Sequence, residues 1–166
     1  MVSQFNSLPD LYDRLYPETQ ENKTIFCIPS ELKLYKNKII HDYEIGLEKV
    51  DSIAKEIFGV GAHEPKKYTI GGIPLIIEYN GKIGVIAGAY DPENDTVILN
   101  FAYYGYFCNP PLLDLNKGKI KYVSGCYKLS GEPSETIAHE LTHALLDELS
   151  YNKTKNEIAT RKLVGS

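Results

Sequence analysis

The sequence lacks the features that mark membrane, secreted and nucleic-acid-binding proteins. In 166 residues no apolar run reaches the length of a membrane-spanning helix, and residues 1–5 do not have the basic-then-apolar order of a signal peptide. The formal charge is −4, and a basic pair such as Lys66-Lys67 is too short to form a nucleic-acid-binding patch. We therefore expect a cytoplasmic protein that binds neither membranes nor nucleic acids.

Cysteine is scarce, with only Cys27, Cys108 and Cys126 in the chain. The three cannot all pair with one another, and no CxxC spacing is present, so a zinc–thiolate knuckle is not expected. Buried free thiols are the expected state, because cysteine is among the most buried residue types. One alternative is a thiolate that covers a metal ion in a latent form of the protein.

The remaining sequence is typical of one globular domain, residues 1–166, of the α+β class. Hydrophobic residues make up 43% of the chain, and neither an internal repeat nor a low-complexity tract is evident. Residues 1–40 look like an irregular N-terminal extension, interrupted by a short strand from Thr24 to Ile28. Apolar periodicity predicts an amphipathic helix from Glu44 to Phe58, ended by the glycines that follow it.

Three strand-like runs follow this helix, at Tyr68 to Tyr79, Gly84 to Tyr90 and Thr96 to Phe101. Asn80-Gly81 is a strong hairpin signal between the first two runs, and the polar residues 91–95 predict a turn between the last two. We therefore expect an antiparallel-rich sheet in front of the C-terminal helices.

The most informative feature is an HExxH pentad, His139-Glu140-Leu141-Thr142-His143. Histidines four residues apart on a helix lie one turn apart on the same face, so both imidazoles can bind one metal ion. The glutamate between them can act as a base on a metal-bound water. Ser134 is the expected N-cap of this helix, and the end is expected near Glu148 or residue 150. Buried positions are expected at Ala138, Leu141, Leu145 and Leu149, which recur at helical spacing.

A catalytic zinc ion usually takes three protein ligands, and a third histidine is not close in the sequence. His41 and His63 both lie well upstream of the pentad. The metzincin pattern is also absent, because Leu146 and Leu149 occupy the positions where that class has a glycine and a third histidine.

The downstream acidic candidates are Asp147, Glu148 and Glu157. Glu148 lies about 140° around the helix from His143 and faces away, while Asp147 is a turn further along. Glu157 belongs to a second helical segment, residues 152–163, and an antiparallel helical hairpin brings it level with His143. The competing interpretation is that Glu157 only pairs with Arg161 on a solvated face.

The pentad followed by Asn156-Glu157 on a second helix resembles the gluzincin branch of zinc metallopeptidases. The compact size is similar to that of the minigluzincins, and the pentad is similar to that of ImmA/IrrE-like peptidases. The resemblance implies a metalloendopeptidase with one catalytic Zn²⁺ bound by His139, His143 and Glu157. It also implies that Glu140 is the general base for hydrolysis of a peptide or protein substrate.

In the same resemblance, peptide substrates add as an extra strand to the sheet edge above the zinc. Here that strand would be Thr96 to Phe101, although an ordinary core or edge strand is as good an interpretation. Candidate groups for stabilising the oxyanion are Tyr103, Tyr104, Tyr106, Tyr151 and His63. Packing beneath a long loop is the favoured role for the aromatic residues between 101 and 107.

Three alternative functions stay open at this point. A regulatory peptidase would cut one dedicated protein, as ImmA-like enzymes do. A latent enzyme would have its zinc covered by the N-terminal 40 residues or by the short C-terminal tail. A non-catalytic interaction module would use zinc for stability alone.

Overall fold

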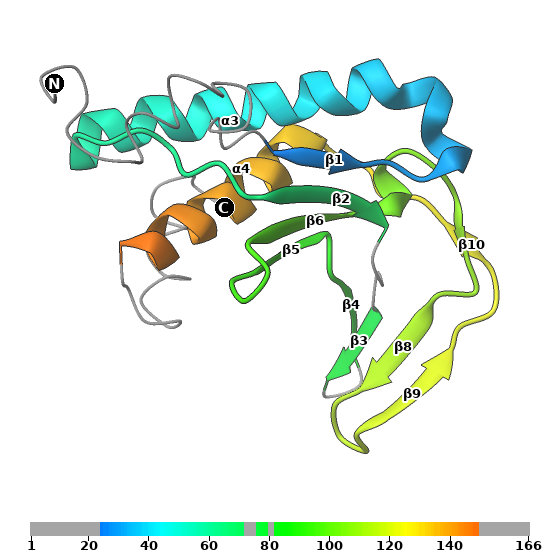
Figure 1. The fold of residues 1–166 in the computed structure, drawn as a ribbon. Coiled ribbons are helices and arrows are strands. Elements are labelled where there is room, and N and C mark those ends of the chain that lie inside the picture. The colour runs from blue at the N-terminus through cyan, green and yellow to red at the C-terminus, as the bar shows by residue number, and fades with distance from the viewer. Residues whose placement is uncertain (1–23, 72–75, 80–81, 150–166) are drawn as a thin grey trace, which may run out of the picture.

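A computed structural model describes residues 24–71, 76–79 and 82–149, and over these residues the protein is a mixed α+β structure. Two long helices, α3 (Lys36–Phe58) and α4 (Pro133–Glu148), lie over one four-stranded sheet (Figure 1). The other elements are β1 (Ile25–Cys27), η1 (Ser30–Tyr35), β2 (Lys67–Gly71), β3 (Ile76–Tyr79), β4 (Lys82–Val85), β5 (Gly88–Asp91), β6 (Thr96–Asn100), η2 (Phe101–Tyr103), β7 (Phe107–Cys108), β8 (Pro111–Asp114), β9 (Lys119–Tyr122) and β10 (Cys126–Tyr127). No helix in these described ranges is both long enough and apolar enough to cross a membrane.

The main sheet has the strand order β1-β2-β6-β5 and is not an antiparallel meander. β1 pairs with β2 and β2 pairs with β6 in parallel, while only β5 and β6 form an antiparallel pair. The predicted turn at 91–95 is confirmed, with Asp91 opposite Thr96. The prediction of an antiparallel-rich sheet is wrong for this sheet, because the chain leaves it after β2 to form β3 and β4 and returns to it as β5 and then β6.

The proposal of Thr96 to Phe101 as an edge strand is also wrong. β6 is an inner strand with neighbours on both sides, and Phe101 begins the 3₁₀ helix η2. Four of its five residues are buried, as expected for a strand enclosed between neighbours. Among the described strands, the edge on this side of the sheet is β5.

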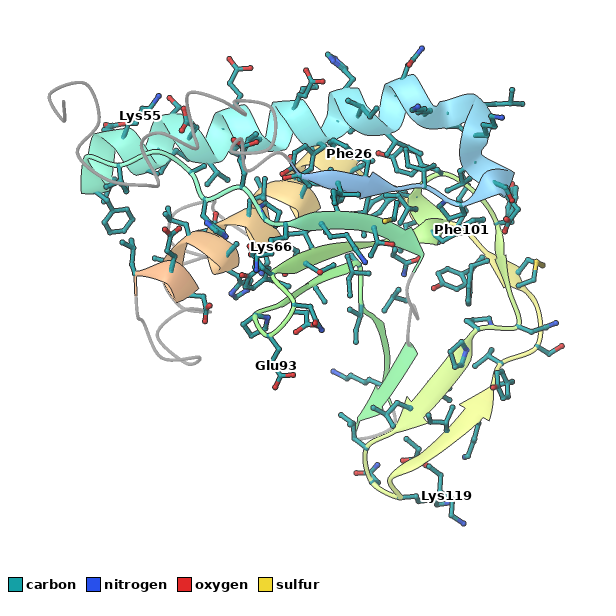
Figure 2. The ribbon with its side chains drawn as sticks, viewed as in Figure 1. Phe26, Lys55, Lys66, Glu93, Phe101 and Lys119 are labelled. Atoms are coloured by element: carbon teal, nitrogen blue, oxygen red, sulfur yellow. A yellow bond between two sulfur atoms is a disulfide. The ribbon has the colours of Figure 1, made fainter. Side chains whose placement is uncertain are left out.

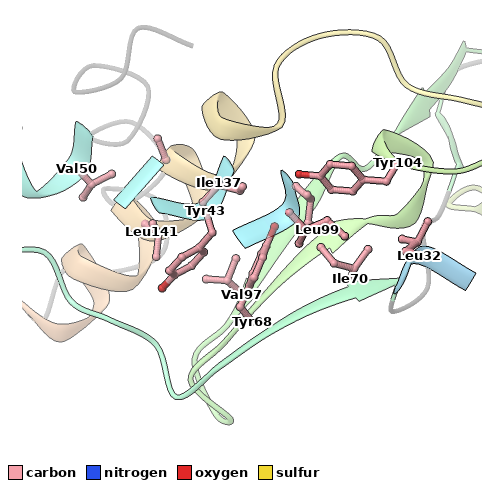
Figure 3. Close-up of a cluster of buried hydrophobic side chains, with 12 residues drawn as sticks. Leu32, Tyr43, Val50, Tyr68, Ile70, Val97, Leu99, Tyr104, Ile137 and Leu141 are labelled. Carbon is pink, nitrogen blue, oxygen red and sulfur yellow. The ribbon is translucent and has the colours of Figure 1, made fainter. Parts of the chain in front are cut away.

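The main core lies between this sheet and the two helices (Figure 3). Alternate residues of β2 and β6 point toward the helices, where Tyr43 of α3 and Ile137 and Leu141 of α4 meet them. The sheet contributes Tyr68, Ile70, Val97 and Leu99. The two helices approach closely at Gly46, where an added Cβ would lie 2.8 Å from a methyl group of Ile137.

The helices differ from the predictions mainly at their ends. α3 begins at Lys36, eight residues before the predicted start, and it ends as predicted at Gly59, whose φ of 69° suits glycine. Ser134 is not the N-cap of α4: Glu132 takes that position, because Pro133 is well suited to the first helical turn. The buried face of α4 is confirmed except at Leu149, which is 38% exposed.

The predicted short strand from Thr24 to Ile28 is confirmed as β1, but the expectation that residues 1–40 are otherwise irregular is wrong for the part that the structure describes. β1 pairs with β2 inside the main sheet, η1 follows, and α3 has begun by residue 36. Residues 1–23 lie outside the described residues.

The second four-stranded sheet, with the order β4-β3-β8-β9, projects away from the helices, and we call it the arm (Figure 1). The predicted strand Tyr68 to Tyr79 is in fact two strands, β2 in the main sheet and β3 in the arm. The predicted strand Gly84 to Tyr90 is likewise two strands, β4 in the arm and β5 in the main sheet. The hairpin signal at Asn80-Gly81 is confirmed, because β3 and β4 are antiparallel with Tyr79 opposite Lys82.

A disulfide closes the base of the arm. The short strands β7 and β10 pair antiparallel with Cys108 opposite Cys126, and these two residues form the disulfide. Both are exposed, whereas Cys27 is a partly buried free cysteine. The expectation of buried free thiols is therefore wrong for Cys108 and Cys126, because non-local strand pairing brings together residues 18 apart in sequence.

Removing this disulfide is expected to destabilise the protein. Closing a loop of 18 residues restricts the unfolded chain enough to stabilise the folded state by about 3 kcal/mol. The double substitution Cys108→Ser and Cys126→Ser should lower the free energy of unfolding by about that amount in urea titrations, and Cys27→Ser is the control. A reductant should shift the midpoint of the parent and leave that of the double variant unchanged; an unshifted parent would contradict the prediction.

Candidate metal centre

The pentad lies in the middle of α4, as its periodicity predicts. Ala138, Leu141 and Ala144 are fully buried and hold the helix against α3 and the sheet. His139 and His143 are partly buried on an adjoining face, and Glu140 is only 7% exposed. The packing of the apolar face therefore fixes the direction in which the two imidazoles project.

The two histidines converge on one point. Their Nε2 atoms lie 3.2 Å apart, with the rings inclined by 72°. Two nitrogens bound to a tetrahedral zinc ion at about 2.0–2.1 Å would be separated by about 3.3 Å. The spacing of the imidazole nitrogens therefore fits a shared zinc ion.

The described residues supply two nitrogen ligands and leave the third ligand as a prediction. Within them no group of three or more His, Cys, Asp or Glu side chains is arranged to bind a metal ion. His41 is exposed on α3, and Asp147 and Glu148 are exposed at the end of α4. Glu157, the predicted third ligand, lies outside the described residues.

Strand β5 lies along α4 beside the pentad. Gly88 is opposite Leu99 and Tyr90 is opposite Val97, so both residues of β5 share the sheet face that α4 covers. A Cβ added at Gly88 would lie 2.8 Å from the methyl group of Thr136 and 3.3 Å from Cγ of Glu140. Glycine at this position therefore lets the edge strand approach the proposed base.

The candidate oxyanion groups are distributed over different parts of the molecule. The hydroxyl of Tyr103 is hydrogen-bonded to that of Thr136, one turn before Glu140. Tyr104 is buried and donates a hydrogen bond of 2.6 Å to Asp42 beneath α3, which separates it from any substrate. Burial and that hydrogen bond raise the pKa of Tyr104, so it stays a neutral donor.

Tyr106 and His63 are also engaged away from the pentad. Tyr106 is 70% exposed beneath the ammonium group of Lys128, at the base of the arm. His63 lies beside the last turn of α4, bound to Glu148. Tyr151 lies outside the described residues. Tyr103 thus has a hydrogen bond to α4 within one turn of Glu140, whereas His63 contacts the last turn of that helix.

Sequence analysis missed a polar bridge centred on His63. Its Nε2 lies 2.9 Å from a carboxylate oxygen of Asp95, and its Nδ1 lies 2.8 Å from one of Glu148. Asp95 also accepts hydrogen bonds from the Tyr90 hydroxyl and from the backbone N–H of Lys66. The bridge therefore joins the end of α4 to the turn that follows β5. No local sequence pattern predicts it, because its residues are distant in the sequence.

No protein-family model matches this chain, and no curated protein and no solved structure gives a significant match.

The bridge makes stability depend on pH through Asp95. Burial alone would raise the pKa of Asp95, but hydrogen bonds from Tyr90 and His63 outweigh it and lower the pKa below its usual value. On acidification the unfolded chain therefore protonates Asp95 first, so its contribution is complete above about pH 4 and is lost as the pH falls through the folded-state pKa. Urea titrations between neutral and acidic pH should show a smaller loss of stability for Asp95→Asn than for the parent.

The control is Glu93→Gln, which removes a carboxylate from the same turn (Figure 2). It should retain the pH dependence of the parent. Equal pH dependence of the parent and Asp95→Asn would contradict the role given to the bridge.

The approach of β5 to α4 gives a second prediction for this region. Gly88→Ala should lower the free energy of unfolding by about 1–3 kcal/mol, because the methyl group meets Thr136 and Glu140 and the carbonyl of Ile98 at 3.0 Å. Gly59→Ala is the matched control, since its cost of about 1–2 kcal/mol would come from a positive φ with no atom within 4 Å. Only Gly88→Ala should also weaken the zinc binding expected at His139 and His143, measured by competition with a chelating dye. Equal zinc affinity of the two variants would contradict the assignment.

Proposed function

We propose that the protein is a zinc-dependent metalloendopeptidase of gluzincin type, with Zn²⁺ bound by His139, His143 and Glu157. The observation that carries the proposal is the 3.2 Å separation of the two Nε2 atoms on a buried helix, with Glu140 between them. This donor set and spacing are those that a catalytic zinc ion requires. A hydrogen bond between the two imidazoles has the same separation, so the zinc measurement below is the one that distinguishes the two arrangements.

The chemistry needs one cation and one base. Zinc, when bound, supplies a Lewis acid that polarises a scissile carbonyl and makes water more acidic. The carboxylate of Glu140 takes the proton of the attacking water and passes it to the nitrogen of the leaving amine. Its burial beside β5 keeps the carboxylate close to a bound peptide and limits its exchange with bulk solvent.

The strand that binds substrate in this proposal is β5. It replaces the segment Thr96 to Phe101, because β6 already has neighbours on both sides. A peptide aligned with β5 would hydrogen-bond through its main chain and pass beside Glu140 at Gly88. Tyr103, held against Thr136, is the described tyrosine best placed to assist at the carbonyl.

We further propose that the enzyme works in an oxidising compartment, in contrast to the cytoplasmic location expected from sequence alone. The disulfide between Cys108 and Cys126 supports this location, because exposed structural disulfides do not persist in a reducing cytosol.

Glu140→Gln tests the assigned chemistry. The variant should keep one zinc ion per chain, because the two imidazoles are unchanged, but hydrolysis should fall by about 10³-fold when the base is lost. Elemental analysis of protein loaded with zinc gives the first quantity, and cleavage of a quenched-fluorescence peptide library gives the second. Glu135→Gln, an exposed glutamate on the same helix, is the matched control and should leave both unchanged.

Four other results would each change the proposal. Turnover by Glu140→Gln equal to that of the parent would refute the role of the base. Zinc retained in full by Glu157→Ala would remove that residue from the ligand set. Stoichiometric zinc without cleavage of any peptide would favour a zinc-stabilised interaction module, and cleavage of one copurifying protein but not of casein would favour a dedicated regulatory peptidase.

A further inference from the structure

The outer strand of the arm, β9, presents two different faces to solvent. Lys119, Ile120, Lys121 and Tyr122 are all exposed, with Ile120 at 61% and Tyr122 at 77%. Because side chains alternate along a strand, the two lysines project to one face and the two apolar residues to the other. Figure 2 shows Lys119 at the end of the arm furthest from the helices.

The backbone of β9 also has an open hydrogen-bonding edge. Val123 donates a hydrogen bond to the carbonyl of Pro110, which fixes the alternation of the antiparallel ladder with β8. Lys119 and Lys121 then direct their backbone groups toward β8, while Ile120 and Tyr122 direct theirs away from it. Among the described strands β9 is the last of this sheet, so these outward groups face no further strand.

The arm has a positive charge in a protein that is negative overall. The two segments of the arm, residues 76–85 and 105–128, contain five lysines and two carboxylates, Glu78 and Asp114, whereas the whole chain has a formal charge of −4. Asp114 is buried and accepts hydrogen bonds from the backbone N–H groups of Asn116 and Lys117. Its other oxygen lies 3.7 Å from Lys121, so it offsets only part of the positive charge around β9.

The arm is joined directly to the strand that lies beside the pentad. Only residues 86 and 87 separate β4 of the arm from β5, whose first residue, Gly88, lies beside Glu140 with no space for a Cβ between them. The arm is thus connected to the proposed catalytic strand through β4, while β9 forms the opposite edge of the arm.

We propose that β9 is a docking strand for the protein substrate, and that it binds an extended segment in which acidic and apolar residues alternate. This inference rests on the proposed peptidase function and names the substrate class. The main chain of the segment pairs with the outward groups of Ile120 and Tyr122. Its acidic side chains lie beside Lys119 and Lys121 on one face of the sheet, and its apolar side chains lie beside Ile120 and Tyr122 on the other face.

An extended peptide fits this surface better than a nucleic acid does. A polyphosphate backbone would use the lysines but could not satisfy the backbone donors and acceptors of β9 together. It would also leave the exposed apolar face without a partner. On β9 both the side chains of one face and the outward backbone groups recur at every second residue, and an extended peptide has this same repeat.

Binding is tested with the full chain in the zinc-loaded Glu140→Gln form, which does not consume the probe. The probe is a fluorescently labelled peptide of alternating glutamate and valine, and its binding is measured by fluorescence anisotropy. A peptide of the same composition with the glutamates and valines in separate blocks should bind at least about fivefold more weakly, because it cannot place each residue type on its own face. Added salt should weaken binding of the alternating peptide.

Two pairs of variants separate the backbone contribution from the charge. Ile120→Pro removes an N–H that points away from β8 and should weaken binding about fivefold relative to Ile120→Val, which keeps the N–H and an apolar side chain. Lys119→Glu should weaken binding about fivefold, while Lys49→Glu makes the same charge change on exposed α3 and should have no effect. Circular dichroism checks that each variant is folded.

Equal affinity for the alternating and block peptides, or unchanged affinity in Ile120→Pro and Lys119→Glu, would overturn the docking strand. Competition by double-stranded DNA at equal affinity would overturn it in favour of a nucleic-acid surface. The parent enzyme distinguishes the two proposals. If it cleaves other peptides while the probe is not bound, only the docking inference fails; if the probe binds β9 and no peptide is ever cleaved, only the peptidase assignment fails.

Discussion

The confinement of α4 between α3 and the sheet is the constraint on which the candidate site depends. Two glycines make it possible, one on each neighbour: Gly46 of α3 meets Ile137, and Gly88 of β5 meets Thr136 and Glu140. Neither position has space for a methyl group without movement of a neighbour. With the helix held on both sides, the rotation of α4 about its axis is fixed, and so is the face from which His139 and His143 project. Convergence of the imidazoles is thus a consequence of core packing as well as of their spacing.

The end of α4 requires a further contribution to stability. Asp147 and Glu148 lie in its last turn, where the carbonyl end of the helix dipole disfavours negative charge, and that turn contains no basic residue. His63 offsets part of this cost by binding Glu148, and its other nitrogen binds Asp95. Tyr90 donates to the same aspartate from β5. The bridge therefore holds the later part of β5 near the end of α4, so that the strand is held against the helix at Gly88 and again through Tyr90 and Asp95.

Local features were predictable from the sequence, and features that depend on distant pairing were not. The pentad helix, the end of α3 at Gly59 and the hairpin at Asn80-Gly81 depend on residues within one or two turns of each other, and the structure has all of them. The parallel pairing of β2 with β6 and the disulfide depend on chain segments that are distant in sequence. Hydrophobic periodicity identified the strand Thr96 to Phe101 almost to its end but carried no information on its neighbours. For the same reason neither the edge position of β5 nor the His63 bridge could be predicted from the sequence.

The edge strands β5 and β9 differ in exposure and in lysine content, and this difference bears on their proposed roles. An open strand edge invites unwanted pairing, and lysines on the edge are a common protection against it. β9 has such lysines, so it is protected against apolar strands in general and stays receptive to an acidic one. β5, with the sequence Gly-Ala-Tyr-Asp, has no lysine and is partly buried along its whole length. Its selectivity must come from what lies beside it, and what lies beside it is the helix with Glu140. In the proposed function, recognition by charge at β9 and alignment by the main chain at β5 are therefore separate tasks, carried by edge strands of two sheets that the short β4–β5 connection links.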